Sequence, residues 1–308
     1  MALLDSLVGL AAKAEATAGV DPTVAEATDS ILMRSLEVNP FDVELINRNL
    51  DRATLGGEGD IIVAKRVGIS FEVEIAGPGT AGDVPEYDAV VEGCGFASTN
   101  GASDHSFDLV SSAFTSVWLE ANRAGTQHIG SYGRGNMTLN YQSKDIPFFG
   151  FQYTCKYNAP TAVALPTYTT SGFQTPEAVS NANTVTATLH GTSLIMESLT
   201  IDMQNQIEHI DRVGSETIEL VNRDIVGTLV VEAPALGTKD WFAAAIARTQ
   251  GVLTIDHGDT SGNIVELDCP LVEITNIDYT ESQGTLMLEM GLKFIPSAGN
   301  DELVLVSK

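Results

Sequence analysis

The sequence predicts a mainly β protein of the α+β class, with two tandem domains that each carry one short helix. Three observations lead to this prediction. Aromatic residues make up 6% of the chain, whereas β-branched residues, glycine and threonine are plentiful, which favours strands. Apolar and polar residues alternate along several segments. One order of elements also occurs twice, in a chain of 308 residues that is long enough for two domains.

The repeated order is clearest between Gly227 and Gly258, where the residues indicate a strand, a loop, a short helix and a second strand. The first strand, Gly227–Val231, is apolar and β-branched, and Pro234 ends it. The chain returns as a strand over Val252–Ile255.

The helix between these strands is predicted from its ends and its apolar face. Thr238 is expected to cap it, with Asp240 in the first turn and Arg248 in the last, as the helix dipole favours. Gly251 is expected to close it. Its apolar face consists of residues at helical spacing: Trp241, Phe242, Ala245, Ile246 and Thr249.

An earlier segment, Gly68–Phe96, repeats this order. Its strand alternates apolar residues with acids: Phe71, Glu72, Val73, Glu74 and Ile75. Asp83 and Glu86 resemble a capping box, so we expect a helix over Pro85–Cys94. Its apolar face is formed by Tyr87, Val90, Val91 and Cys94.

The match extends upstream of both units. Ser30–Val38 aligns with Ser193–Ile201 at a constant offset (193 − 30 = 163), with four of nine residues identical. The interpretation is a duplicated domain. The alternative is that two unrelated β domains share an alternation by chance.

The predicted division is an N-terminal arm (1–27), a first β domain (28–157), an extended linker (158–183) and a second β domain (184–308). The arm contains an apolar run, Leu3–Ala11, that suggests an amphipathic helix. A signal peptide is the alternative, but no basic region precedes the run and the acid Asp5 stands before most of it. The run is also too short to span a membrane. The segment 158–183 has three prolines and one charged residue, Glu177, which is typical of a linker.

The charge and the cysteines exclude several classes of protein. The net charge is −25, from 41 acidic and 16 basic residues, and ordinary nucleic-acid binding needs basic residues that replace counterions on phosphates. Cys94, Cys155 and Cys269 show no CxxC spacing, so we expect reduced thiols rather than a disulfide framework.

One motif suggests an enzyme. Gly77–Gly82 reads GPGTAG, a GxGxxG sequence between a strand and a helix, as in dinucleotide-binding folds. The strand before it alternates with acids, however, whereas a central parallel strand is buried on both faces. A surface loop is therefore the preferred interpretation, with a nucleotide-dependent enzyme as the alternative.

No other motif indicates catalysis or a cofactor. The histidines are scattered, without HExxH or Cys-His spacing. The segment Asp256–Asn263 offers oxygen ligands for a cation, but a Gly-rich hairpin turn explains it as well and is preferred. Acids on predicted strands would give an assembly a negative surface, and they are the candidate site residues: Glu72, Glu74, Glu232, Glu266 and Asp268.

Several short motifs, taken in order, resemble the major tail tube proteins of long-tailed bacteriophages. The motifs are Val73–Pro85 with Tyr87, Gly93–Phe96, Gly133–Gly135, Phe173–Pro176, His257-Gly258, Gly262-Asn263 and Ile295–Glu302. The resemblance implies a β-sandwich or small-barrel fold with one flanking helix per copy. It also implies a structural protein of the virion tail, without catalytic residues or a cofactor. Another tail ring, a baseplate protein or a surface shaft protein is the structural alternative.

The resemblance further implies partners. The subunits would form rings that stack into a tube, assemble in the host bacterial cytoplasm and contact the tape measure, the tail terminator and the baseplate or distal tail proteins. Phage DNA would pass down the bore without specific binding, and no membrane partner is implied. Two copies in one chain predict a trimeric, pseudo-hexameric ring whose bore is acidic.

Overall fold

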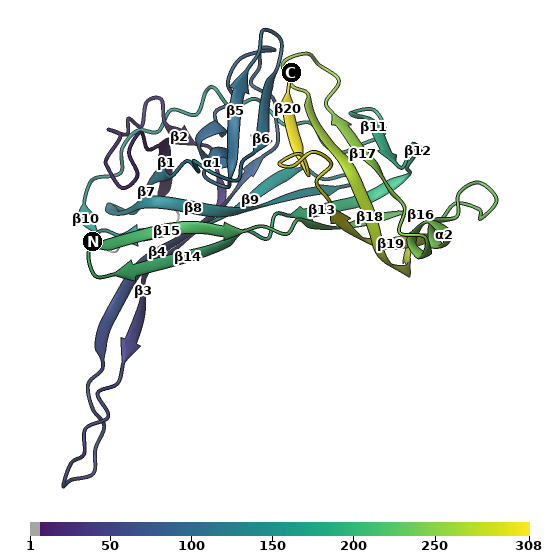
Figure 1. Cartoon of the computed structure of the whole chain (residues 1–308). Coiled ribbons are helices and arrows are strands. Elements are labelled where there is room, and N and C mark those ends of the chain that lie inside the picture. Colours follow the sequence, from purple (N-terminus) through teal and green to yellow (C-terminus); the bar gives the residue numbers. More distant parts are fainter. Residues whose placement is uncertain (1–6) are drawn as a thin grey trace.

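The computed structural model describes residues 7–308, and antiparallel strands dominate it (Figure 1). The elements up to residue 162 are β1 (Val8–Ala14), β2 (Ser30–Ile31), β3 (Arg34–Ile46), β4 (Ile61–Glu74), α1 (Asp88–Glu92), β5 (Phe96–Asn100), β6 (His105–Leu109), β7 (Val117–Arg123), β8 (Thr126–Gln142), β9 (Phe148–Tyr157) and β10 (Thr161–Ala162). The later elements are β11 (Thr184–Leu189), β12 (Thr192–Ser193), β13 (Met196–Asp202), β14 (Gln206–Arg212), β15 (Ser215–Asn222), β16 (Val226–Glu232), α2 (Trp241–Ile246), β17 (Gln250–His257), β18 (Val265–Ser282), β19 (Thr285–Phe294) and β20 (Val304–Ser307). No helix among these residues is long and apolar enough to cross a membrane. The mainly β prediction, with two short helices, is confirmed.

The first half is built around the long strand β8. Its N-terminal part pairs with β7, which pairs with β1, and β1 pairs with β2. β8 also pairs with β9, then β9 with β4 and β4 with β3. The two sheets share β8 and enclose a core, because every second residue of each strand turns inward. The inward side chains include Phe71, Leu139, Phe151, Tyr153 and Leu119.

The second half repeats these pairings element by element. β11 corresponds to β1, β12 to β2, β13 to β3, β16 to β4, β17 to β7, β18 to β8 and β19 to β9. Each of the pairings of the first half has its counterpart: β11–β12, β11–β17, β17–β18, β18–β19, β16–β19 and β13–β16. The short helices α1 and α2 also follow corresponding strands, β4 and β16.

Two strand pairings join the halves into one sheet system. The C-terminal part of β8 pairs with β13, from Thr138 opposite Asp202 to Gln142 opposite Ser198. The β5–β6 hairpin belongs to the first half, and β6 pairs with the C-terminal strand β20. The sequence does not reveal β20, because its few apolar residues follow an irregular loop and gain a partner only in the fold.

Both predicted helices form, but their ends differ from the prediction. Asp240, not Thr238, caps α2, and its carboxylate accepts a hydrogen bond from the Ala243 amide at 2.9 Å. The helix ends at Ile246, with Ala247 as its C-cap residue, and Gly251 lies in β17. Trp241 is buried as expected and Ala245 packs against the core, whereas Ile246 is exposed.

In α1 the predicted capping box is absent. Tyr87 is the cap residue, and no side chain bonds to the first-turn amides. The predicted apolar face is correct: Tyr87, Val90, Val91 and Cys94 are all buried. The Tyr153 hydroxyl donates a hydrogen bond to the Val90 carbonyl and connects the helix to β9.

The expected N-terminal helix is wrong for residues 8–14; residues 1–6 of that prediction lie outside the described part of the chain. Val8–Ala14 is strand β1, paired with β7 along its whole length. Leu10, Ala11 and Ala12 are buried together, so both faces of the strand are covered. A strand buried on both faces has an unbroken apolar run, which sequence reasoning does not distinguish from a helix.

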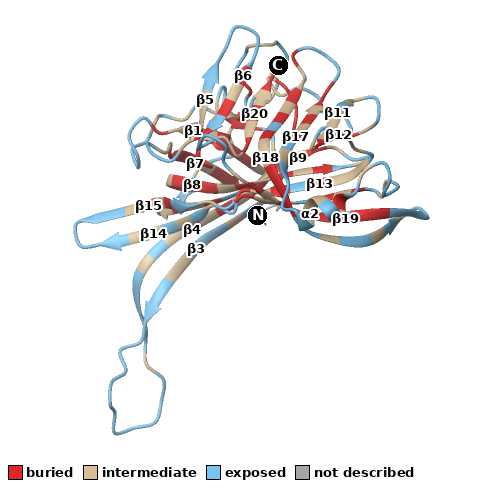
Figure 2. Ribbon diagram, turned by 45° about the vertical axis from the view of Figure 1, so that its right-hand side comes forward, coloured by how far each residue is buried: buried red, intermediate tan, exposed pale blue. Residues whose placement is uncertain are grey.

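Of two long hairpins, one extends from the body and the other lies against it. β3 and β4 form a long hairpin that points away from the rest of the molecule (Figure 1), and Asn39-Pro40 lies at a bulge within β3. The outer part of the β3–β4 hairpin is exposed (Figure 2). The β14–β15 hairpin, which follows β13, instead lies against β8 and β9.

Candidate functional site

The most extended surface feature is one face of a continuous row of strands. Eight strands pair in the order β3-β4-β9-β8-β13-β16-β19-β18, all antiparallel. Along β4, Val67, Ile69, Phe71 and Val73 are buried, and the residues between them are open. The same alternation holds in β9, β13 and β16. One face of the row therefore covers the core, and the other face, called the open face below, carries the exposed and half-buried residues of this alternation.

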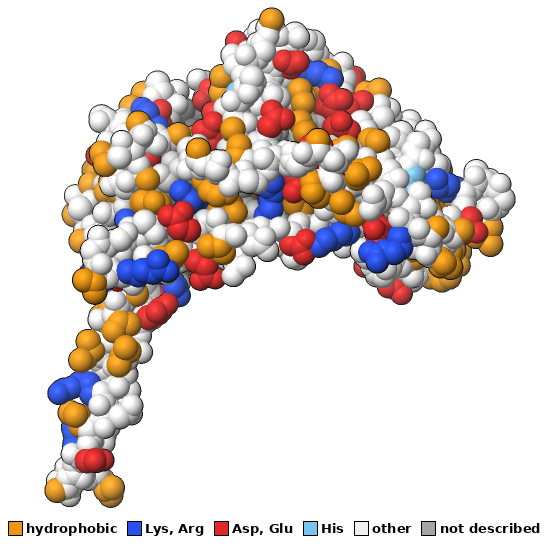
Figure 3. Space-filling view, in the orientation of Figure 1, with side chains coloured by type: hydrophobic (Ala, Val, Ile, Leu, Met, Phe, Trp, Pro, Cys, Tyr) orange, Lys and Arg blue, Asp and Glu red, His pale blue; other side chains and the backbone are white. Residues whose placement is uncertain are grey.

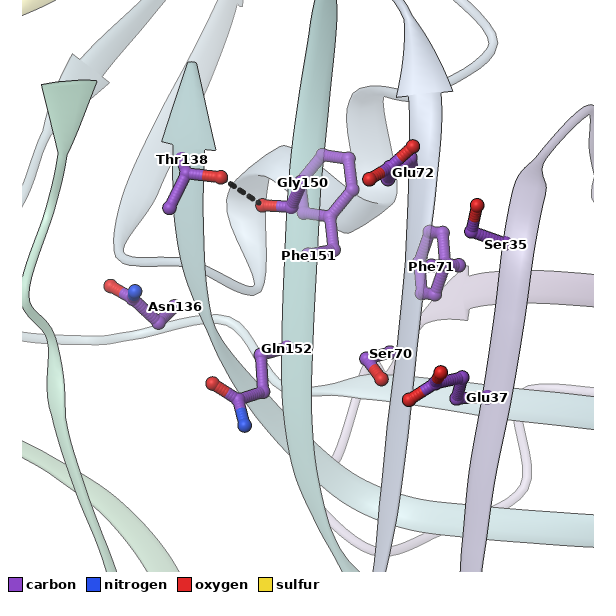
Figure 4. A pocket seen from close by; sticks show the side chains of 10 residues that line it. All are labelled: Ser35, Glu37, Ser70, Phe71, Glu72, Asn136, Thr138, Gly150, Phe151 and Gln152. Atoms are coloured by element: carbon purple, nitrogen blue, oxygen red, sulfur yellow. Dashed lines mark hydrogen bonds between the residues drawn. The ribbon is translucent and has the colours of Figure 1, made fainter. Parts of the chain in front are cut away.

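A shallow groove of about 360 Å³ lies on this open face in the first half (Figure 4). Polar side chains line most of it: Ser35, Glu37, Ser70, Glu72, Asn136, Thr138 and Gln152. Gly150 lies in its floor, and its carbonyl accepts a hydrogen bond from the Thr138 hydroxyl at 3.5 Å. The surface is polar and lacks a nucleophile paired with a base, so it offers contact rather than catalysis.

The structure separates the candidate acids into two groups. Glu72 and Glu74 on β4 and Glu232 on β16 lie on the open face, alternating with buried residues. Glu74 and Glu232 end corresponding strands, so they occupy equivalent places in the two halves. Glu266 and Asp268 lie elsewhere, on the part of β18 that pairs with β17 and β20.

Sequence reasoning missed further acids on the open face. They are Glu37, Asp202, Asp278 and Glu289, and each alternates with apolar residues that face the core. That alternation was the available signal. Asp202 accepts a hydrogen bond from the Asn136 amide at 2.8 Å across the junction of the two halves.

Several basic side chains on the same face are held by acids. Arg34 donates to Glu72 at 2.8 Å, and Lys293 pairs with Asp224. Arg134 pairs with Glu219 of β15 at 2.8 Å and is covered by that strand. Lys156 of β9 belongs to the same face, and its ammonium lies over the Tyr132 ring at 4.4 Å from the ring centroid. Because Arg34, Arg134 and Lys293 are held by acids, the further carboxylates give the open face an excess of negative charge.

The two Gly-rich motifs contact each other. The amide of Gly77 donates to the Asn263 side chain at 2.9 Å, and that of Gly79 donates to the Gly262 carbonyl at 2.7 Å. A Cβ on Gly77 would collide with that same carbonyl oxygen, so the close approach requires glycine. Amides that a pyrophosphate would need are thus already bonded, and the motif joins the two halves.

The buried titratable groups serve the fold. The Nε2–H of His257 donates to the Glu177 carbonyl oxygen at 3.0 Å, its Nδ1 lies 3.1 Å from the Thr184 hydroxyl, and burial lowers its pKa. Burial raises the pKa of the Cys94 thiol to about 12 and also raises the pKa values of Cys155 and Cys269. In residues 7–308 no three His, Cys, Asp or Glu side chains gather to hold a metal ion, and the Asp256–Asn263 segment comprises the end of β17 and the turn that follows it.

Comparison with known proteins supplies the identity of the fold. A model of the family described as phage tail tube protein matches residues 5–301. Among curated proteins, no sequence matches the chain closely enough to support a comparison. The family match covers nearly the whole chain, both halves included. The chain therefore belongs to the phage tail tube protein family.

Proposed function

We propose that three chains close a ring with pseudo-sixfold symmetry, and that these rings stack into a tube with an acidic bore. Membership of the family makes the protein a non-enzymatic structural component of the virion tail, which assembles with itself and with other tail proteins. The number of chains in a ring and the lining of the bore are the proposed further steps.

The pairing of β8 with β13 is the observation that carries the proposal. It places the edge of the second half beside the first half, with Leu139 opposite Ile201. The two halves repeat their strand pairings, so we infer that they are two copies of one domain, residues 28–157 and 184–308, joined by 158–183. If each copy fills one of six places around an axis, each chain fills two adjacent places and three chains complete the ring.

The open face of the strand row is proposed as the lining of the bore. DNA that moves through a tube must not be held, so the lining should lack free cations and repel phosphates. The acids on this face repel phosphates, Arg34, Arg134 and Lys293 are engaged in ion pairs, and Lys156 lies over the Tyr132 ring. A closed barrel of such rows also leaves no strand edge exposed to DNA.

The tube also needs contacts between rings and at its two ends. The β3–β4 hairpin exposes large apolar side chains to water: Leu45, Ile46, Leu50, Leu55, Ile61, Ile62 and Val63. Figure 3 shows hydrophobic groups along it. Exposed apolar surface of this extent marks an interaction site, so we propose that it packs on a neighbouring subunit. The tape measure would occupy the bore, and the tail terminator and the baseplate or distal tail proteins would cover the ends.

Electron microscopy of the purified full-length chain tests the ring. The expected images are stacked rings of three chains, with sixfold features at low resolution and threefold symmetry outside, where the β5–β6 hairpin has no counterpart. Rings of six chains would contradict the proposal, because fusion of two copies would then not have replaced separate subunits.

A further inference from the structure

We propose that the ring closes through a specific strand pair between copies: β3 of one chain with the C-terminal part of β18 of the next, Val38 opposite Tyr279. This inference rests on the proposed ring and names its interface. It arises from the internal junction, because β3 corresponds to β13 and β18 corresponds to β8. The contact that β13 makes with β8 inside the chain would recur between chains.

Both edges needed for this contact are open. In the described residues β3 has one strand partner, β4, so its other edge has no ladder. β18 pairs with β17 and β20 only as far as Glu273, and beyond Ile274 its sole partner within residues 7–308 is β19. An unpaired edge of this kind is a template for a strand of another chain.

The repeated pairings also determine the register. Val38 lies opposite Ile69 as Ile201 lies opposite Gly227, so Val38 corresponds to Ile201. By the same comparison Ile277, opposite Met290, corresponds to Met137, opposite Phe151. Counting along the strands assigns Tyr279 to the place of Leu139 and Thr280 to that of Asn140. Within the chain, Ile201 is opposite Leu139 and Thr200 opposite Asn140. The interface therefore places Val38 opposite Tyr279 and Glu37 opposite Thr280.

The residues at the two free edges are more exposed than their counterparts at the β8–β13 pair, as expected for strand edges whose partner is another chain. Tyr279 is 66% exposed, whereas its counterpart Leu139 is 0% exposed. Leu36 and Val38 are only partly buried, whereas Leu199 and Ile201, which correspond to them, are completely buried. Pairing of β3 with β18 would cover the apolar side chains of both edges on the core face of the sheet. The corresponding side chains at the β8–β13 pair are covered in this way within the chain.

The polar face is compatible as well. Glu37 would lie beside the Thr280 hydroxyl, and Asn39 beside Asp278, so each carboxylate faces a neutral hydrogen-bond donor. No two like charges lie directly opposite in this register, which favours the strand pair because opposed like charges destabilise it. A symmetric pair of two β3 edges is the competing arrangement, and it would give a closed dimer.

Disulfide trapping tests the register. Residues directly opposite on paired strands have Cβ atoms about 5 Å apart, within reach of a disulfide, whereas diagonal neighbours are about 7–8 Å apart. The test chain carries Glu37→Cys and Thr280→Cys on the polar face, where both sites lie at the surface. The native cysteines are fully buried and stay reduced. Mild oxidation should yield covalent dimers and then trimers, with no larger species.

Three controls complete the test. Thr200→Cys with Asn140→Cys should form a disulfide within one chain, so that the protein stays a monomer under denaturing conditions. Glu37→Cys with Asp278→Cys, a diagonal pair in the proposed register, should cross-link much more weakly than the in-register pair. Glu37→Cys alone should stay monomeric under denaturing conditions; covalent dimers from it would identify the β3–β3 arrangement and overturn the proposal.

A second variant separates this interface from the ring itself. Tyr279→Lys should prevent ring closure, while Val185→Lys, at an equally exposed site (65%) on β11, should not. Suppose that the wild-type protein forms three-chain rings. If the Glu37→Cys, Thr280→Cys variant then gives no disulfide between chains, or if the Tyr279→Lys variant still forms rings, the proposed interface is overturned and the proposed function stands. Absence of any ring from wild-type protein would overturn the proposed function.

Discussion

Ile201 on β13 lies directly opposite Leu139 on β8, and both side chains are completely buried where the two halves of the chain meet. The sheet crosses from one half to the other without interruption at this pair. The strength of this contact, and of its proposed copy between chains, can be measured separately.

Replacing Ile201 by Ala should lower the free energy of unfolding by about 2–5 kcal/mol, because a filled core site loses several methyl groups and leaves a cavity. Val38→Ala is the matched variant, since Val38 occupies the equivalent place at the open edge. It should cost the isolated chain less than about 1 kcal/mol but weaken ring formation. Urea unfolding at low protein concentration, followed by microscopy at high concentration, distinguishes the two. If Val38→Ala and Ile201→Ala lowered the free energy of unfolding equally, Val38 would already be fully packed in the monomer, which contradicts an open β3 edge.

Charge reversal on the open face should convert the bore into a DNA-binding surface. Tubes of the variant with Glu74→Lys and Glu232→Lys should retain short duplex DNA that resists nuclease, since added cations gain from releasing counterions. The control variant carries Glu266→Lys and Asp268→Lys. Its tubes should bind DNA that nuclease digests, because those acids lie on a different part of the sheet system. Nuclease-sensitive DNA on both variants would mean that the open face is not the lining.

The cysteines should be inert in the native protein. All three are fully buried, and burial raises the thiol pKa of Cys94 to about 12, so little thiolate is present at neutral pH. Iodoacetamide should label them only after unfolding. Cys155→Ala should cost about 1–2 kcal/mol through a small cavity and leave assembly intact. A disulfide between Cys94 and Cys155 in native tubes would contradict this expectation.

Mild acid should weaken the contact around His257. Burial lowers the pKa of this histidine in the folded chain, so the unfolded chain binds the proton first as the pH falls below about 6.5. Stability is therefore fully present above that value and declines as the pH falls toward the folded pKa, by at most about 1.4 kcal/mol per pH unit. Comparing denaturant unfolding of wild type and His257→Gln between about pH 7.5 and 5.5 isolates this contribution. Equal pH slopes would exclude it.

Local patterns in the sequence determined the strands, the helices and the repeated order. Phe71–Ile75 and Leu286–Phe294 alternate because one face of each strand is buried, and that period is visible without any partner. Ser30–Val38 and Ser193–Ile201 align because four of their nine residues are identical at a constant offset. The same alternation identified Glu72, Glu74 and Glu232, three of the acids on the open face.

Only the tertiary structure decided which edges meet. Strand β1 is buried on both faces and shows no alternation, so its apolar run predicted a helix until its pairing with β7 was known. The pairing of β8 with β13 and of β6 with β20 joins residues far apart in the chain. Backbone hydrogen bonds make these contacts, and every residue type except proline supplies the same donor and acceptor. The side-chain pattern therefore specifies which face of a strand is buried, whereas the choice of its neighbour is made by the packing of the whole molecule.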